Sequence, residues 1–152
     1  LGDTRSRGLE FSLAGPLTSR LDILAGAVIG RTSVTGGAVR DGLVGSRAVG
    51  RPDGRGSIAL EWQTPLATGL RVNASVSHIT AVVASNDNRA RAPSRTTIDI
   101  GLRQSLTIAS APAQLRLLIT NIANQYGVEV LGSGVYDIAA GRAAQLSLGV
   151  DF

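Results

Sequence analysis

Polar and apolar residues alternate along most of this chain, and the alternation predicts β-strands. In the last ten residues, Ala144, Leu146, Leu148, Val150 and Phe152 are apolar, whereas the residues between them are polar or small. Because successive side chains of a strand point to opposite faces, this segment has one apolar face and one polar face. A terminal strand of this kind needs a partner strand or a closed barrel, since an uncovered edge invites aggregation.

The same alternation recurs in six earlier segments, so the sequence predicts seven strands. The expected strands are 6–14, 21–31, 56–63, 70–82, 96–106, 114–122 and 143–152. On each strand one face is apolar, and the other carries isolated charges among Ser, Asn, Gln and Gly. The alternation is weaker at Leu24, Val28 and Leu118, which are apolar residues on the polar faces.

The connections between these strands alternate between short and long. The short ones are expected at 15–20, 64–69 and 106–113, and Gly15-Pro16 is expected to end the first strand. The long ones are expected at 32–55, 85–94 and 123–142. A β-sandwich gives no reason for this alternation, whereas membrane barrels have short periplasmic turns and long extracellular loops. The pattern therefore predicts an all-β, antiparallel transmembrane β-barrel segment of about seven strands, with a periplasmic C-terminus.

Composition and charge exclude several other classes of protein. The chain has no Cys, so neither disulfides nor thiolate metal sites are expected. The net charge is +4, but the 15 basic residues are all Arg, are scattered, and have few aromatic neighbours, so no nucleic-acid partner is expected. No apolar run approaches the roughly 20 residues of a membrane helix, and no signal peptide is visible at the start. The apolar faces carry no charge at mid-strand, as lipid contact requires, because Arg or Lys at the bilayer midplane costs about 2–4 kcal/mol.

No pattern in the sequence predicts catalysis, a cofactor or a metal site. His78 is the single histidine, and no nucleophile motif lies near it, so the chain is not expected to be an enzyme. The clearest charged group is Arg89, Arg91 and Arg95, in a loop expected to be extracellular. These three arginines would suit contact with an anionic surface such as lipopolysaccharide or, alternatively, with an anionic ligand.

Five segments, in order along the chain, resemble TonB-dependent outer-membrane receptors of the ferric-siderophore type. Residues 5–30 resemble the hairpin pattern GxExxxxGxLTxxLxLxAGxxY, and residues 44–52 resemble the loop pattern GxxPxGxP. Residues 96–101 resemble the strand YTTVDLGxxY, and residues 117–126 resemble LNVxNLFDKxY. Residues 141–152 resemble the terminal pattern GxPRxxxLSLxYDF.

The resemblance implies that residues 1–152 form the C-terminal portion of a larger receptor barrel, without its plug domain and its earlier strands. Such a receptor takes up a ferric siderophore or a similar large nutrient across the bacterial outer membrane, and this chain would supply barrel wall and extracellular loops. The implied partners are outer-membrane lipid and lipopolysaccharide, the barrel-assembly machinery, TonB acting through the plug, and the siderophore. Leu146, Leu148, Val150 and Phe152 would form the signal that the assembly machinery reads.

Two alternatives stay open from the sequence. A self-contained eight-stranded outer-membrane barrel fits the length, provided that residues 32–55 contain an eighth strand. A soluble β-sandwich binding module is the other alternative.

Overall fold

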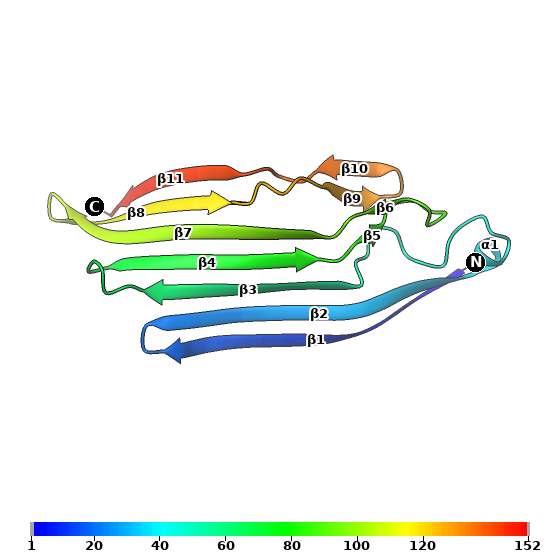
Figure 1. The fold of residues 1–152 in the computed structure, drawn as a ribbon, viewed down its shortest axis with the longest axis horizontal. Helices are drawn as coiled ribbons and strands as arrows, with labels where there is room; N and C mark the ends of the chain where they lie inside the picture. The colour runs from blue at the N-terminus through cyan, green and yellow to red at the C-terminus, as the bar shows by residue number, and fades with distance from the viewer. Residues whose placement is uncertain (1, 152) are drawn as a thin grey trace.

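The computed structural model describes residues 2–151, and its main feature is one antiparallel sheet of seven strands (Figure 1). The strands lie side by side in the order β1-β2-β3-β4-β7-β8-β11. They are β1 (Gly2–Thr18), β2 (Leu21–Gly36), β3 (Gly54–Gln63), β4 (Leu70–Ile79), β7 (Arg95–Ile108), β8 (Ala111–Thr120) and β11 (Ala143–Val150). The predicted all-β class and the seven strands are confirmed. Phe152 lies outside the described residues.

The register of the sheet aligns the apolar residues of all seven strands on one side, called here the apolar face. Residues that lie directly opposite each other on paired strands share a face. One row crosses five strands through Leu13, Ala25, Ile58, Val76 and Ile98. Another row, at the far edge, passes through Leu102, Leu117 and Leu146. The face opposite is called the polar face.

The apolar face is uncovered by any other part of the described chain. Leu9 on β1 is 82% exposed, and Leu146 on β11, at the opposite edge of the sheet, is 68% exposed. Soluble monomers rarely expose a continuous apolar patch larger than a few hundred Å². The described residues form no second sheet packed on this face, so the two-layer sandwich alternative is wrong for this chain.

The short turns lie at one end of the sheet and the long loops at the other, as predicted (Figure 1). Two small hairpins lie at the loop end: β5 (Val82–Val83) pairs with β6 (Arg91–Ala92), and β9 (Val128–Gly132) pairs with β10 (Val135–Ile138). Most of the buried apolar residues are here, including Val83, Ala84 and Ala139. The connection expected at 123–142 therefore contains a small hairpin of its own. No pattern in the sequence predicted it, because strands of four or five residues are too short to show a clear period.

The first strand does not end at Gly15-Pro16, as the sequence predicted, but continues to Thr18. In the described chain β1 hydrogen-bonds only to β2, so the missing N–H of Pro16 can point to the free edge without the loss of a ladder bond. Gly15 has a φ of 152°, which favours glycine, and the register shifts between Pro16 and Thr18. The irregularity is thus absorbed as a bulge, and the turn shrinks to Ser19 and Arg20.

The turn expected at 106–113 is also shorter than predicted, because it consists of Ala109 and Ser110 alone. Both residues have positive φ angles, 49° and 69°, as a two-residue turn that matches strand twist requires. Other strand ends move by a few residues: β4 stops at Ile79, before the predicted end at 82.

Residues 32–55 contain no additional strand of the main sheet. Instead, β2 extends to Gly36, a four-residue helix α1 (Gly37–Arg40) follows, and the rest is loop until β3 begins at Gly54. Within residues 2–151, β1 and β11 are the two edges of the sheet and do not pair with each other. The described chain therefore does not form the closed eight-stranded barrel of the other alternative. No helix in this part of the chain has the length and apolar character to cross a membrane.

Candidate functional site

The polar face carries an ion-pair cluster near the short turns. Glu61, on β3, accepts a hydrogen bond from Arg71 on β4 at 2.6 Å and another from Arg103 on β7 at 2.5 Å, one through each carboxylate oxygen. Arg103 lies directly opposite both Arg71 and Arg116 in the sheet. Three guanidinium groups therefore line up across three strands. Two carboxylates lie beside them, Glu61 and the Asp22 that faces it on β2, so this part of the face carries a net positive charge.

The Glu61 cluster offsets the repulsion between arginines that face each other across β4 and β7. We expect Glu61→Gln to lower the free energy of unfolding by about 1–2 kcal/mol, because like charges left directly opposite each other are destabilising. Urea titration of the complete protein in detergent measures this change. Glu10→Gln is the matched control, since Glu10 lies on the same face and has no ion-pair partner within residues 2–151. A loss as large in the control would show that the Glu61 cluster contributes nothing.

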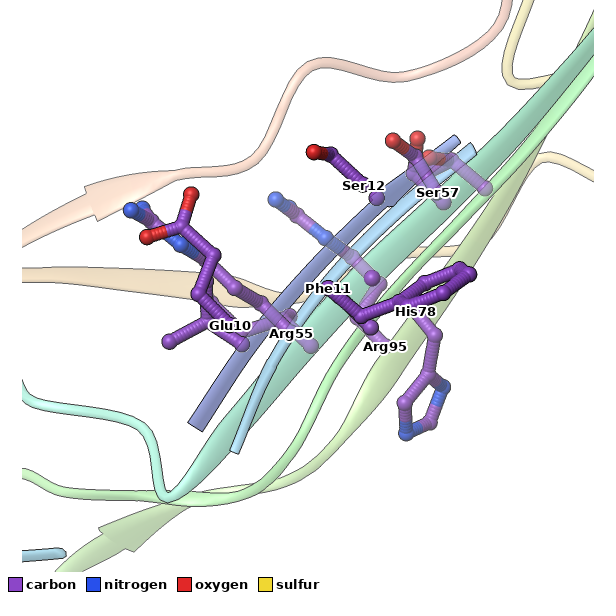
Figure 2. A pocket seen from close by; sticks show the side chains of 14 residues that line it. Glu10, Phe11, Ser12, Arg55, Ser57, His78 and Arg95 are labelled. Atoms are coloured by element: carbon purple, nitrogen blue, oxygen red, sulfur yellow. The ribbon is translucent and has the colours of Figure 1, made fainter. Parts of the chain in front are cut away.

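A hollow of about 430 Å³ lies further toward the long loops. On the polar face it is lined by charged and hydroxyl side chains from four strands: Glu10, Ser12, Arg55, Ser57, Ser77, Arg95 and Thr97. Figure 2 shows Glu10, Ser12 and Ser57 on one side of the sheet, and Phe11 and His78 on the other. The volume lies within the range of small-molecule sites. The lining suits hydrogen bonding and charge pairing with a polar ligand, and it offers no arrangement of nucleophile and base.

His78 lies on the apolar face, level with Gly56 and Thr96 on the neighbouring strands. Its Nδ1 atom is 2.8 Å from the hydroxyl oxygen of Thr96. Within the described residues, no group of three or more His, Cys, Asp or Glu side chains is placed to hold a metal ion.

The three arginines singled out from the sequence have different surroundings. Arg89 has a side chain that is 90% exposed and lies 3.8 Å from Asp87. Arg91 is an exposed residue of β6. Arg95 was expected in the loop, but it is the first residue of β7. Its half-buried side chain donates a hydrogen bond of 2.7 Å to Glu129. Arg89 and Arg95 each have a carboxylate partner already, which reduces the charge that they offer to an anionic ligand.

The long loops are held together by polar contacts that the sequence did not predict. The side-chain oxygen of Asn88 accepts from the backbone N–H of Arg47 at 2.8 Å, and its amide donates to the Arg47 carbonyl at 3.0 Å. The Tyr136 hydroxyl donates to the Ala84 carbonyl at 2.7 Å, which joins the β9–β10 hairpin to the β5–β6 segment. Hydrogen bonds from the Ser85 hydroxyl and from the Arg89 backbone N–H lower the pKa of the Asp87 carboxyl.

Asn121 anchors the longest of these loops. The residue is almost fully buried, at 4% exposure, and its φ is 48°. The amide donates to the carbonyls of Gln125 at 2.9 Å and Ala140 at 3.0 Å, and the side-chain oxygen accepts from the Gln125 N–H at 2.9 Å. Its own backbone N–H donates to Asp99 at 2.8 Å. Asparagine tolerates left-handed backbone conformations and bonds to nearby backbone, which is the one signal in the sequence that points to this position.

The residues of the predicted assembly signal lie on β11. Leu146 and Leu148 point to the apolar face, opposite Leu117 and Leu115 of β8, and both are exposed. Val150 lies opposite Ala113 and is partly buried. The fourth member, Phe152, is outside the described residues.

The chain is similar to part of several siderophore receptors. No protein-family model matches the chain. The ferrioxamine receptor of Yersinia enterocolitica is 28% identical over 155 residues, covering 99% of this chain and 21% of that receptor. Among solved structures, BauA, the ferric preacinetobactin receptor of Acinetobacter baumannii, is 26% identical with a TM-score of 0.87, covering 99% of this chain and 22% of its own. The ferric-catecholate import receptor Fiu of K12 E. coli, at 17% identity and a TM-score of 0.76, shares the fold over 97% of this chain and 21% of its own.

The resemblance to TonB-dependent siderophore receptors is therefore confirmed over nearly the whole chain. The similar structures are β-barrel receptors, and the seven-stranded sheet matches part of their fold. The chain spans about a fifth of the length of the proteins that it matches.

Proposed function

We propose that this chain is the C-terminal wall segment of an outer-membrane TonB-dependent receptor that imports a ferric siderophore. The observation that carries the proposal is the uncovered apolar face, continuous over seven strands, with a charged and hydroxyl-rich face opposite. A membrane barrel needs this arrangement, because its outer surface meets lipid and its interior is polar. Similarity to the ferrioxamine and ferric preacinetobactin receptors supports a siderophore as cargo.

In this proposal the chain contributes three things to the complete receptor. The apolar face forms lipid-facing wall, the loops at 37–53, 80–94 and 121–142 lie outside the cell, and β11 carries the signal for the barrel-assembly machinery. TonB would act through a plug domain in another part of the protein. Transport of this kind binds and releases the cargo without covalent chemistry, so no enzymatic step is assigned to the chain.

The polar hollow at the loop end is the proposed cargo-facing part of the wall. Arg55 and Arg95 border it together with Glu10 and several hydroxyl groups, which suits a cargo rich in oxygen donors. Arg89 and Arg91, in the 80–94 loop, are further candidates for contact with the cargo or with lipopolysaccharide.

The test is uptake of iron by cells that lack the gene for the complete protein. With ⁵⁵Fe loaded on a panel that includes ferrioxamine and a catecholate siderophore, the deletion strain should lose energy-dependent uptake of at least one complex. Expression of the complete protein should restore that uptake, and the protein should sediment with the outer membrane. Unchanged uptake of every complex, together with recovery of the protein in the soluble fraction, would contradict the proposal.

A further inference from the structure

The apolar face of β1 and β2 passes directly into an arginine pair, Arg7 and Arg31. On β1, Leu13, Phe11 and Leu9 share a face with Arg7, because alternate residues of a strand point to the same side. On β2, Ala25, Ala27 and Ile29 lead in the same way to Arg31. Arg5 lies on the same face of β1, two residues before Arg7. Toward the long loops, β1 and β2 continue as a projecting ribbon past Gly54, the first residue of β3 (Figure 1).

Arg7 and Arg31 lie directly opposite each other in the register of the sheet. Both are exposed, and within residues 2–151 neither has a carboxylate within 4.0 Å. Asp3 is on the same face of β1, but it lies opposite Thr35, two positions beyond Arg5. Like charges that face each other across two strands are destabilising, so this pair favours an anion between the two guanidinium groups.

The position of the pair relative to the apolar face sets its depth in a membrane. Arg7 is two residues beyond Leu9, and Arg31 is two residues beyond Ile29. Two residues advance an antiparallel strand by about 6.8 Å, or about 5 Å in height for a strand tilted by about 45°. The headgroup layer adds about 5–8 Å to each side of the hydrocarbon core. If Leu9 and Ile29 lie at the edge of the hydrocarbon core, the guanidinium groups lie at the depth of the lipid phosphates.

We propose that Arg7 and Arg31, with Arg5 beside them, bind a phosphate group of an outer-leaflet lipid on the outside of the barrel wall. Guanidinium groups bind phosphate oxygens through paired, charge-assisted hydrogen bonds, and two of them on one surface match one phosphate. The proposal rests on the proposed function in one respect, because it requires the apolar face to meet lipid. It assigns to the ribbon a lipid site that is separate from the polar hollow.

The test uses the complete receptor, purified in a neutral detergent and titrated with bis-phosphorylated lipid A. The readout is the temperature at which the folded, fast-migrating form is lost on a gel. Removal of both charges in Arg7→Gln/Arg31→Gln should weaken the apparent affinity for lipid A roughly 30-fold. Arg40→Gln, which removes an exposed arginine from α1, should leave the affinity unchanged. Fully dephosphorylated lipid A should not shift the wild-type transition.

Four results would overturn the lipid site. Two concern the variants: wild-type affinity in the double variant, or an equal loss in Arg40→Gln. Two concern the wild type: an equal shift with fully dephosphorylated lipid A, or with inorganic phosphate at the same phosphate concentration. Failure of the proposed function looks different, because the wild type would then give no heat-sensitive folded form in any detergent and would not support iron uptake. If the double variant folds and imports iron normally while it loses the response to lipid A, the lipid site is supported independently of transport.

Discussion

Replacement of Leu60 by arginine is expected to lower the free energy of unfolding of the complete receptor by about 2–4 kcal/mol. Leu60 lies at mid-strand on the apolar face, opposite Ile23 on β2 and Ala74 on β4. If this face meets lipid, the guanidinium group would lie near the bilayer midplane, where neither water nor a carboxylate is available to it. Urea titration of the folded, heat-sensitive form in lipid vesicles gives the change in stability.

The same leucine-to-arginine change at Leu24 is the control. Leu24 is on β2, opposite Ala59, so it belongs to the polar face, and it is 62% exposed. Asp22 and Glu61 lie nearby on that face and would accommodate a cation. The effect should stay within about 0.5 kcal/mol, as for other exposed positions. Equal losses for Leu60→Arg and Leu24→Arg would show that the two faces do not differ in their contact with lipid.

The second large effect is expected for Asn121→Ala, which should lower the local stability of the loop formed by residues 121–142. The substitution removes three side-chain hydrogen bonds and leaves groups of Gln125 and Ala140 without these partners. A buried polar group without a partner costs about 1–3 kcal/mol, so the anchored loop should lose about 3 kcal/mol or more of local stability. Hydrogen–deuterium exchange at the Gln125 amide and limited proteolysis between 122 and 142 report this opening.

Asn121→Gly separates the two causes of the expected loss. Glycine adopts the φ of 48° without strain but cannot replace the side-chain hydrogen bonds. If the hydrogen bonds dominate, the glycine variant should open nearly as much as the alanine variant. Native-like protection in Asn121→Gly would instead assign the anchor to backbone conformation alone. In both variants the folded barrel should persist, because the strand pairing of β8 with β11 ends at Thr120 and Ala143.

Much of the sheet could be predicted because strand formation is a local property. Alternation at period two identified seven strands and their apolar faces, and it depends only on residues close in sequence. Two errors in the strand predictions also arose from short stretches of sequence. Gly15-Pro16 is a reliable turn signal in isolation, but an edge strand can absorb it. The short strands β9 and β10 offered too few residues to show a period.

The candidate site was much less predictable. Arg89, Arg91 and Arg95 are close in sequence, yet Arg95 begins a strand and pairs with Glu129, 34 residues away. The partner of Glu61 on β7, Arg103, is 42 residues away. Neither pair has a signature in the sequence, because each depends on which strands are neighbours and on the register between them.

The sequence by itself determined that the chain is all-β, that each strand has one apolar face, and that short and long connections alternate. These properties follow from side-chain chemistry over a few residues. Only the tertiary structure decided that the seven apolar faces join into one uncovered surface, that Glu61 lies between Arg71 and Arg103, and that Asn121 closes the last loop. It also placed Arg7 opposite Arg31 at the border of the apolar face. The physical reason is that a one-residue shift in register would turn every side chain of a strand to the other face, and the register is set between strands and not within them.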